Sequence, residues 1–192
     1  MTDETRQVPA TTRLFPGWRW VLMAVAIPIA GLIGWAVSGP VDAPAAALIG
    51  GLITGAGLGA AQWFAAKDAF GDARTWIATS AVAYGAGLLV AAAAVGYNTD
   101  LGSLAAMGAI SGLFLGVGQG LALMQQGRSR LAFAWAAAMP VLLALGWAAT
   151  TVIGIDVDEQ FTVFGASGAI VFTLLSGFVL ARFSPTVTRA AA

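Results

Sequence analysis

The sequence predicts an all-α integral membrane protein, with six transmembrane helices arranged as three tandem helical hairpins in a pseudo-threefold bundle. Three observations predict this fold: the composition, six long uncharged segments, and a motif that recurs along the chain. The 192 residues are 59% hydrophobic and 9% charged, with a mean hydropathy of +0.85. A soluble domain carries about 25% charged residues because its surface faces water. The chain therefore lacks the charges that a soluble surface needs.

The composition also argues against several classes of function. The formal net charge is zero, and no basic patch of the kind that binds nucleic acid is present. The chain has no Cys and no His, which excludes disulfides, Cys/His zinc sites and His-ligated haem. No ionisable residue lies deep in an uncharged segment, and no nucleophile has a basic partner nearby. We therefore expect no catalytic residue, no cofactor and no metal site, and so not an enzyme.

Six uncharged windows define the expected spans. A helix needs about 20 apolar residues to cross the hydrocarbon core of a membrane. The shortest window has 22 residues, so every one is long enough. The windows are residues 20–41, 43–66, 75–99, 101–127, 131–155 and 160–181.

The basic residues predict the orientation. All nine Lys and Arg lie at the two ends of the chain or in the second and fourth loops, whereas the other loops carry only acidic charges. The positive-inside rule then puts both termini in the cytoplasm. The expected organisation is a cytoplasmic leader over 1–16, a transmembrane domain over 17–182 whose first apolar stretch is retained as a signal anchor, and a cytoplasmic tail over 183–192.

A glycine-rich motif recurs along the chain. Residues 51–62, GLITGAGLGAAQ, return 57 positions later at 108–119 as GAISGLFLGVGQ, and a weaker copy begins at Gly168. Three hairpins in one orientation predict a pseudo-threefold axis normal to the membrane. The hairpin repeats span about 17–66, 74–125 and 130–182.

Small residues spaced four apart predict the helix-packing faces. Helices in lipid attract one another by close backbone approach and dispersion, which small residues permit. We expect the even-numbered spans to form a tightly packed inner layer; the alternative is a glycine-lined surface for a flat ligand or a narrow pore. The glycines concerned are Gly51, Gly55, Gly59, Gly108, Gly112, Gly116 and Gly120.

Two glutamines and two prolines recur inside the spans. Gln62 and Gln119 are candidate polar intramembrane contacts, either as a clamp between helices or as a contact for a headgroup or solute. Pro28 and Pro140 each remove a backbone donor and predict kinks at equivalent heights. Shared curvature of the bundle is the first interpretation of the kinks, and a gating hinge is the alternative.

Aromatic and acidic residues gather near the span ends. We expect the aromatic side chains to form interfacial belts; they are Trp18, Trp20, Trp63, Trp76 and Phe133 at one end and Trp35, Tyr97 and Trp147 at the other. Asp42, Asp100, Asp156 and Asp158 occupy the three acidic loops. Solvation of these loops is the first interpretation, and a ring that attracts cations to a channel mouth is the alternative.

The first hairpin ends in Gly-x3-Gly-x2-Gln-Trp, at residues 55–63. It resembles repeats in uncharacterised small bacterial multi-pass membrane proteins, over about residues 47–182. The second copy departs from the pattern, with Gly120 in place of the Trp. The resemblance implies a bacterial cytoplasmic (inner) membrane and no particular activity.

These observations favour a non-catalytic integral membrane protein that serves as a scaffold, an accessory subunit or a lipid-binding helical bundle. One alternative is a passive channel or facilitator for a small neutral solute, lined by Gln62, Gln119 and the outer carboxylates. Another is a ligand-binding subunit of a larger transporter. The expected partners are membrane lipid and either another membrane protein or further copies of this chain, with no nucleic acid.

Overall fold

The computed structural model describes residues 11–13, 17–154, 161–184 and 186–188. Most of these residues are helical, which confirms the predicted all-α fold, and six helical segments are long and apolar enough to cross a membrane. The first segment, Trp18–Ser38, contains α1 and α2. The helices are α1 (Trp18–Val21), α2 (Met23–Ser38), α3 (Pro44–Phe70), α4 (Ala73–Ala94), α5 (Leu101–Gln125), α6 (Ser129–Val152) and α7 (Ala166–Phe183).

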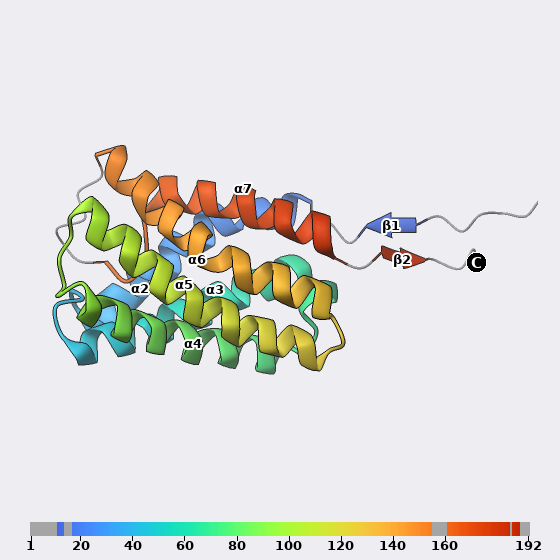
Figure 1. Ribbon diagram of the computed structural model, residues 1–192, viewed down its shortest axis with the longest axis horizontal. Helices are drawn as coiled ribbons and strands as arrows, with labels where there is room; N and C mark the ends of the chain where they lie inside the picture. The colour runs from blue at the N-terminus through green and yellow to red at the C-terminus, as the bar shows by residue number, and fades with distance from the viewer. Residues whose placement is uncertain (1–10, 14–16, 155–160, 185, 189–192) are drawn as a thin grey trace, which may run out of the picture.

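The long helices lie side by side and alternate in direction (Figure 1). Each packs against its neighbours in chain order, and α7 also packs against α2, so the six spans close into a ring. The predicted hairpins α2–α3, α4–α5 and α6–α7 are all packed pairs in this ring. Outside it, β1 (Thr11–Arg13) pairs antiparallel with β2 (Thr186–Thr188).

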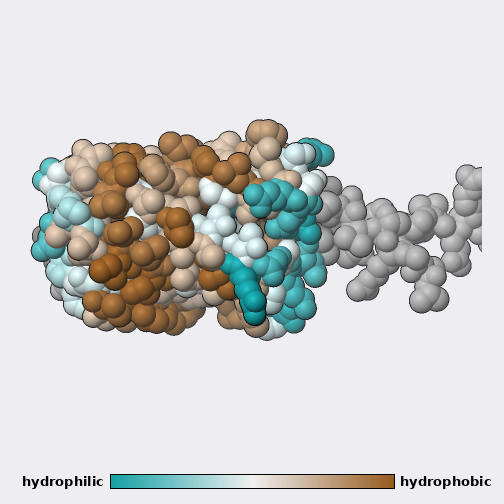
Figure 2. Space-filling model, turned by 90° about the horizontal axis from the view of Figure 1, so that it is seen from below, coloured by the Kyte–Doolittle hydropathy of each residue, from teal (hydrophilic) through white to brown (hydrophobic). Residues whose placement is uncertain are grey.

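The two ends of the bundle differ in charge. We call the end that carries Lys67, Arg74, Arg128, Arg130 and Arg182 the basic end, and the end that carries Asp42 and Asp100 the acidic end. On the face seen in Figure 2, hydrophobic side chains form a broad band across the body, and hydrophilic side chains gather at both ends. A band of this kind between two polar ends is typical of a bundle that spans a membrane.

The predicted glycines let neighbouring helices approach closely. A Cβ at Gly55 would lie 2.5 Å from the carbonyl oxygen of Ser80 in α4, and one at Gly112 would lie 2.5 Å from that of Met139 in α6. All seven glycines abut α4 or α6 in this way. The expected inner layer of even-numbered spans is wrong in this respect, because the glycines of α3 and α5 face the next helix of the ring rather than one another.

The last span begins later than the sequence predicts. The uncharged window starts at residue 160, which lies outside the described residues, but α7 begins only at Ala166. Residues 161–165 are not helical, and Thr162, Val163 and Phe164 are buried. We call residues 161–165 the inserted segment. It contains two aromatic and two β-branched residues, which favour helix less than the alanines that begin α3.

The prolines lie inside continuous helices. Pro28 is within α2 and Pro140 within α6. A backbone break instead occurs in α3 at Ala66, with φ −143° and ψ 46°. The predicted proline kinks stay a prediction. The break at Ala66 changes the direction of the last residues of α3, which include the buried Phe70.

Aspartates cap two of the helices. The Asp72 carboxylate accepts a hydrogen bond from the Thr75 backbone nitrogen (2.8 Å) at the start of α4, and Asp100 accepts from the Ser103 nitrogen (3.0 Å) at the start of α5. The Thr75 backbone hydrogen bond lowers the pKa of Asp72, and the Ser103 hydroxyl lowers the pKa of Asp100. Asp100 therefore has a structural role as a helix cap.

Candidate functional site

An aromatic cluster fills the bundle at the basic end. It consists of Trp20 from α1, Phe70 from α3, Trp76 from α4 and Trp135 from α6, each at most 2% exposed. Phe70 stacks on Trp76 with ring centroids 4.1 Å apart and meets Trp135 edge-on at 5.4 Å, and Trp20 lies 6.3 Å from Trp135. Trp20, Trp76 and Trp135 come from the first, third and fifth spans, which are not neighbours in the ring. Their side chains can therefore meet only in the interior of the ring.

The aromatic cluster corrects part of the expected interfacial belt. Trp18 and Phe133 are 69% and 67% exposed, as a belt requires. Trp20 and Trp76 are instead buried inside the ring, and Trp147 at the other end is also buried. The expectation is wrong for these three residues, because proximity to the end of a span does not say which side of the helix faces lipid.

Gln62 and Gln119 lie next to the aromatic cluster and contact each other. The Gln119 amide nitrogen donates to the Gln62 side-chain oxygen at 2.7 Å and to the Ser80 hydroxyl at 2.8 Å. The Trp76 indole nitrogen donates to the Gln62 oxygen at 3.2 Å, and the Trp135 indole nitrogen donates to the Gln119 oxygen at 2.7 Å. Both glutamines are fully buried, so these hydrogen bonds replace water at both side-chain oxygens and at the Gln119 nitrogen.

These contacts follow one pattern around the ring. The glutamine oxygen of α3 accepts a hydrogen bond from the indole of α4, and the glutamine oxygen of α5 accepts one from the indole of α6. The Trp20 indole donates to the Thr173 carbonyl oxygen of α7 at 2.9 Å. In the sequence copy that contains α7, Val179 stands where Gln62 and Gln119 stand in the other two. A backbone carbonyl therefore replaces the missing amide oxygen.

The sequence carries a signal for these tryptophans that position in the spans does not reveal. Trp20, Trp76 and Trp135 recur at spacings of 56 and 59 residues, close to the 57-residue offset of the glycine motif. Side chains at equivalent positions of repeated hairpins face equivalent directions. Trp135 lies three residues, just under one helical turn, beyond the position that a second spacing of 56 would give, so the near-regular spacing indicates a shared interior face.

The inserted segment occupies the interior towards the acidic end. The Thr162 hydroxyl accepts from the Thr54 hydroxyl at 2.9 Å and donates to the Gly31 carbonyl oxygen at 2.8 Å. The Tyr84 hydroxyl donates to the Thr162 carbonyl oxygen at 2.9 Å. Thr54 and Tyr84 lie near the middle of α3 and α4, so the segment reaches deep into the bundle. Non-helical backbone at membrane depth is tolerated where protein surrounds it.

The polar groups of the interior are enclosed. Gln62, Gln119, Ser80, Thr54 and Thr162 are each at most 1% exposed. Within the part of the chain that the structure describes, the aromatic cluster lies on one side of the glutamines and the inserted segment fills the interior on the other. Among the described residues, the polar side chains beside the glutamines are therefore shielded from solvent. The Gln62 amide nitrogen has no hydrogen-bond partner among the described residues.

The outer carboxylates do not come together as a described ring. Asp42 is exposed, and Asp100 caps α5. Asp156 and Asp158 lie outside the described residues. The ring that the channel hypothesis invokes therefore stays a prediction.

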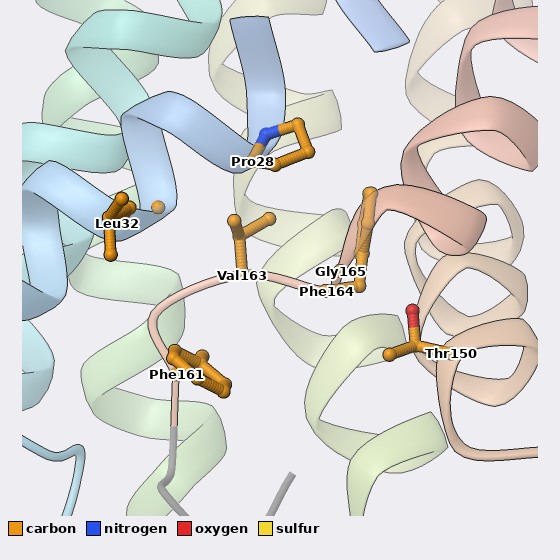
Figure 3. Close-up of a pocket in the computed structure, with 8 residues that line it drawn as sticks. Pro28, Leu32, Thr150, Phe161, Val163, Phe164 and Gly165 are labelled. Atoms are coloured by element: carbon orange, nitrogen blue, oxygen red, sulfur yellow. The ribbon is translucent and has the colours of Figure 1, made fainter. Parts of the chain in front are cut away.

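A crevice opens beside the inserted segment, as Figure 3 shows. Its volume is about 270 Å³, and it lies between α2, α6 and the segment, which forms its floor. Leu32 is 56% exposed at its rim, so the crevice opens on the outer surface of the bundle. The side chains around it are almost all apolar: Pro28, Leu32, Thr150, Phe161, Val163 and Phe164.

Comparison with known proteins gives no family: the chain matches no protein-family model, no curated protein and no solved structure.

Proposed function

We propose that the protein is a non-catalytic membrane bundle that binds lipid on its side, with a sealed interior, and that it serves as a scaffold or accessory subunit. The observation that carries the proposal is the apolar crevice at the inserted segment. Pro28 and Leu32 lie in the middle of the first span, at the depth of acyl chains. An acyl chain is the occupant that suits this crevice.

The chemistry of the crevice supports an acyl chain. Its lining offers hydrocarbon surfaces, and the Thr150 hydroxyl already bonds to the Gly146 carbonyl oxygen of its own helix at 3.1 Å. Apolar cavities stay dry and accept apolar ligands. Lipid tails surround the rim, so dispersion contacts with the crevice walls favour a chain entering it.

The sealed interior argues against the alternative of a passive channel. A channel on the axis needs polar groups that contact water. Gln62 and Gln119 are instead buried and form hydrogen bonds with each other, with Ser80 and with two indoles. Opening a path would require the aromatic cluster to separate. No specific observation favours the solute facilitator or the transporter subunit over the lipid-binding bundle.

The proposed setting is the cytoplasmic membrane of a bacterium, with the basic end and both termini in the cytoplasm. The basic residues of the described spans and of the loops between them all lie at this one end, which supports the orientation by the positive-inside rule; they are Arg19, Lys67, Arg74, Arg128, Arg130 and Arg182. The proposed partners are membrane lipid and either another membrane protein or further copies of the chain.

Photocrosslinking tests the crevice. The protein is reconstituted with a phospholipid that carries a diazirine near the middle of one acyl chain, irradiated, digested and mapped by mass spectrometry. We expect crosslinks concentrated on the crevice residues of α2 and the inserted segment. Crosslinks spread evenly over the lipid-facing residues would contradict the proposal.

A matched pair of variants controls for general effects on the bundle. Leu32→Trp fills the rim of the crevice, whereas Ile33→Trp adds the same side chain at the next position, which is 51% exposed and does not line the crevice. We expect Leu32→Trp to abolish the concentrated crosslinks and Ile33→Trp to preserve them. Equal crosslinking in the two variants would exclude the crevice as the lipid site.

A further inference from the structure

A second cavity lies at the basic end, between the start of α6 and the end of α7. Its volume is about 270 Å³. The side chains that give it its character are Arg128, Ser129, Arg130, Arg182, Phe183 and Ser184. Three guanidinium groups thus surround one pocket, and none of its described lining residues carries a carboxylate. A pocket with this concentration of positive charge attracts anions.

Two of the three guanidinium groups lie against an aromatic ring. Arg130 and Arg182 lie over the ring of Phe183, with their Cζ atoms 5.7 Å and 5.6 Å from its centroid. Neither they nor Arg128 form an ion pair within the described part of the chain. Three cations that share a pocket without a counter-charge repel one another, so an anion between them would relieve that repulsion.

Unpartnered donors point to the same conclusion. One terminal nitrogen of Arg128 and the hydroxyl of Ser184 are shielded from solvent, and neither has a hydrogen-bond partner among the described residues. Donors without partners at a shielded position are costly. A ligand with several acceptor oxygens would satisfy both.

The backbone adds to the positive potential. The pocket is also lined by residues 129–131, the first turn of the 24-residue helix α6. Arg128, at the capping position, makes no side-chain hydrogen bond to that turn. The first amide groups of α6 therefore receive no capping bond from the Arg128 side chain and lie beside three arginines, and helix starts of this kind bind anions.

We propose that this pocket binds a phosphate group. Phosphate presents several oxygens in a geometry that guanidinium groups can grip with paired hydrogen bonds, and basic pockets between membrane helices hold lipid headgroups. The phosphate of an anionic phospholipid and free inorganic phosphate share this chemistry. The proposal is independent of the crevice, which lies near the start of α7 rather than its end.

Two probes distinguish the two sources. The full chain in an uncharged detergent is mixed with equal amounts of phosphatidylglycerol and phosphatidylcholine of identical acyl chains, and retained lipid is measured by native mass spectrometry. In a separate arm, inorganic phosphate is titrated into delipidated protein and followed by calorimetry. We expect the protein to retain about tenfold more phosphatidylglycerol than phosphatidylcholine, as charge-assisted hydrogen bonds from arginine would give.

Variants assign the binding to the pocket. The double variant Arg130→Gln with Arg182→Gln removes two of the three charges at the surface of the bundle, and Arg74→Gln removes one at the same end but outside the pocket. We expect the double variant to lose the preference for phosphatidylglycerol and Arg74→Gln to keep it. Circular dichroism of each variant verifies that the bundle has folded.

Each outcome bears on the proposal. Retained phosphatidylglycerol that depends on the two arginines supports a headgroup site. Calorimetric binding of inorganic phosphate with the same dependence, and no lipid preference, supports a site for free phosphate. The proposal is overturned if the double variant and Arg74→Gln behave alike in both arms, or if the wild-type protein binds neither probe.

Discussion

Gln119 joins three other side chains in the interior of the bundle. Its nitrogen donates to Gln62 and Ser80, and its oxygen accepts from Trp135. Each partner comes from a different helix, so one residue of α5 fixes the positions of α3, α4 and α6 relative to one another. Its energetic contribution comes mainly from partners that would otherwise be left buried without a hydrogen bond.

Replacing Gln119 with leucine tests this contribution. Gln119→Leu keeps a side chain of similar size but leaves the Ser80 hydroxyl and the Trp135 indole without this partner. We expect the protein to fold and insert, with its free energy of unfolding lowered by about 1–3 kcal/mol. Denaturant titration in detergent micelles measures the change. Gln125→Leu, at an exposed position of the same helix, is the control, and equal stability of the two variants would remove Gln119 from this role.

At the scale of residues, the sequence identifies the glutamines but not their partners. Gln62 and Gln119 stand out because amides are rare in apolar spans and these two recur in register. Trp76 and Trp135 do not stand out, because tryptophan near the end of a span is usually interfacial. The burial of these indoles depends on the rotation of each helix in the ring, which hydropathy along the chain does not encode.

At the scale of elements, the contact between α5 and α6 depends on Gly112. A Cβ there would lie 2.5 Å from the Met139 oxygen and 2.7 Å from the Cα atom of Pro140. Both are backbone atoms, so they cannot rotate away as the tip of a side chain can. The two helices would have to separate to accommodate even a methyl group.

Gly112→Ala is therefore expected to lower the free energy of unfolding by about 1–3 kcal/mol, the usual cost of overpacking. Thermal unfolding in micelles, followed by circular dichroism, measures the loss. Gly102→Ala is the matched control in the same helix, because the only neighbouring atom that its Cβ would meet is the Asp100 side-chain oxygen at 3.2 Å. The control should lose less stability than Gly112→Ala, because the Asp100 side chain can shift whereas the backbone atoms of Met139 and Pro140 cannot, and alanine favours helix. A Gly112→Ala variant as stable as this control would contradict the assigned packing.

Five of the six spans lie close to their predicted windows, whereas the start of the sixth does not. Hydropathy counts Phe161 and Val163 as part of a span because both are apolar. It cannot tell a helix from an extended segment buried by its neighbours, since both are shielded from water. What holds the inserted segment is a set of partners distant in sequence, namely Thr54, Tyr84 and Gly31, and these become neighbours only in the folded ring.

At the scale of the whole molecule, the ring is closed but not uniform. Its helices pack closely from α2 round to α7, and the inserted segment stands beside α2 where the last helix would otherwise begin. The crevice that we propose for an acyl chain follows from this substitution of a thin extended segment for a helical turn. The sequence predicts the hairpins that build the ring, but not the crevice, which depends on where α7 begins.

Solute flux through the reconstituted protein tests the central claim, a sealed interior, most directly. Liposomes with and without the wild-type protein are subjected to a gradient of urea or glycerol, and their volume change is followed by stopped-flow light scattering. The account predicts identical rates for the two preparations, because the aromatic cluster and the inserted segment enclose the polar interior. A protein-dependent flux that falls in Gln119→Trp would contradict it and restore the channel hypothesis.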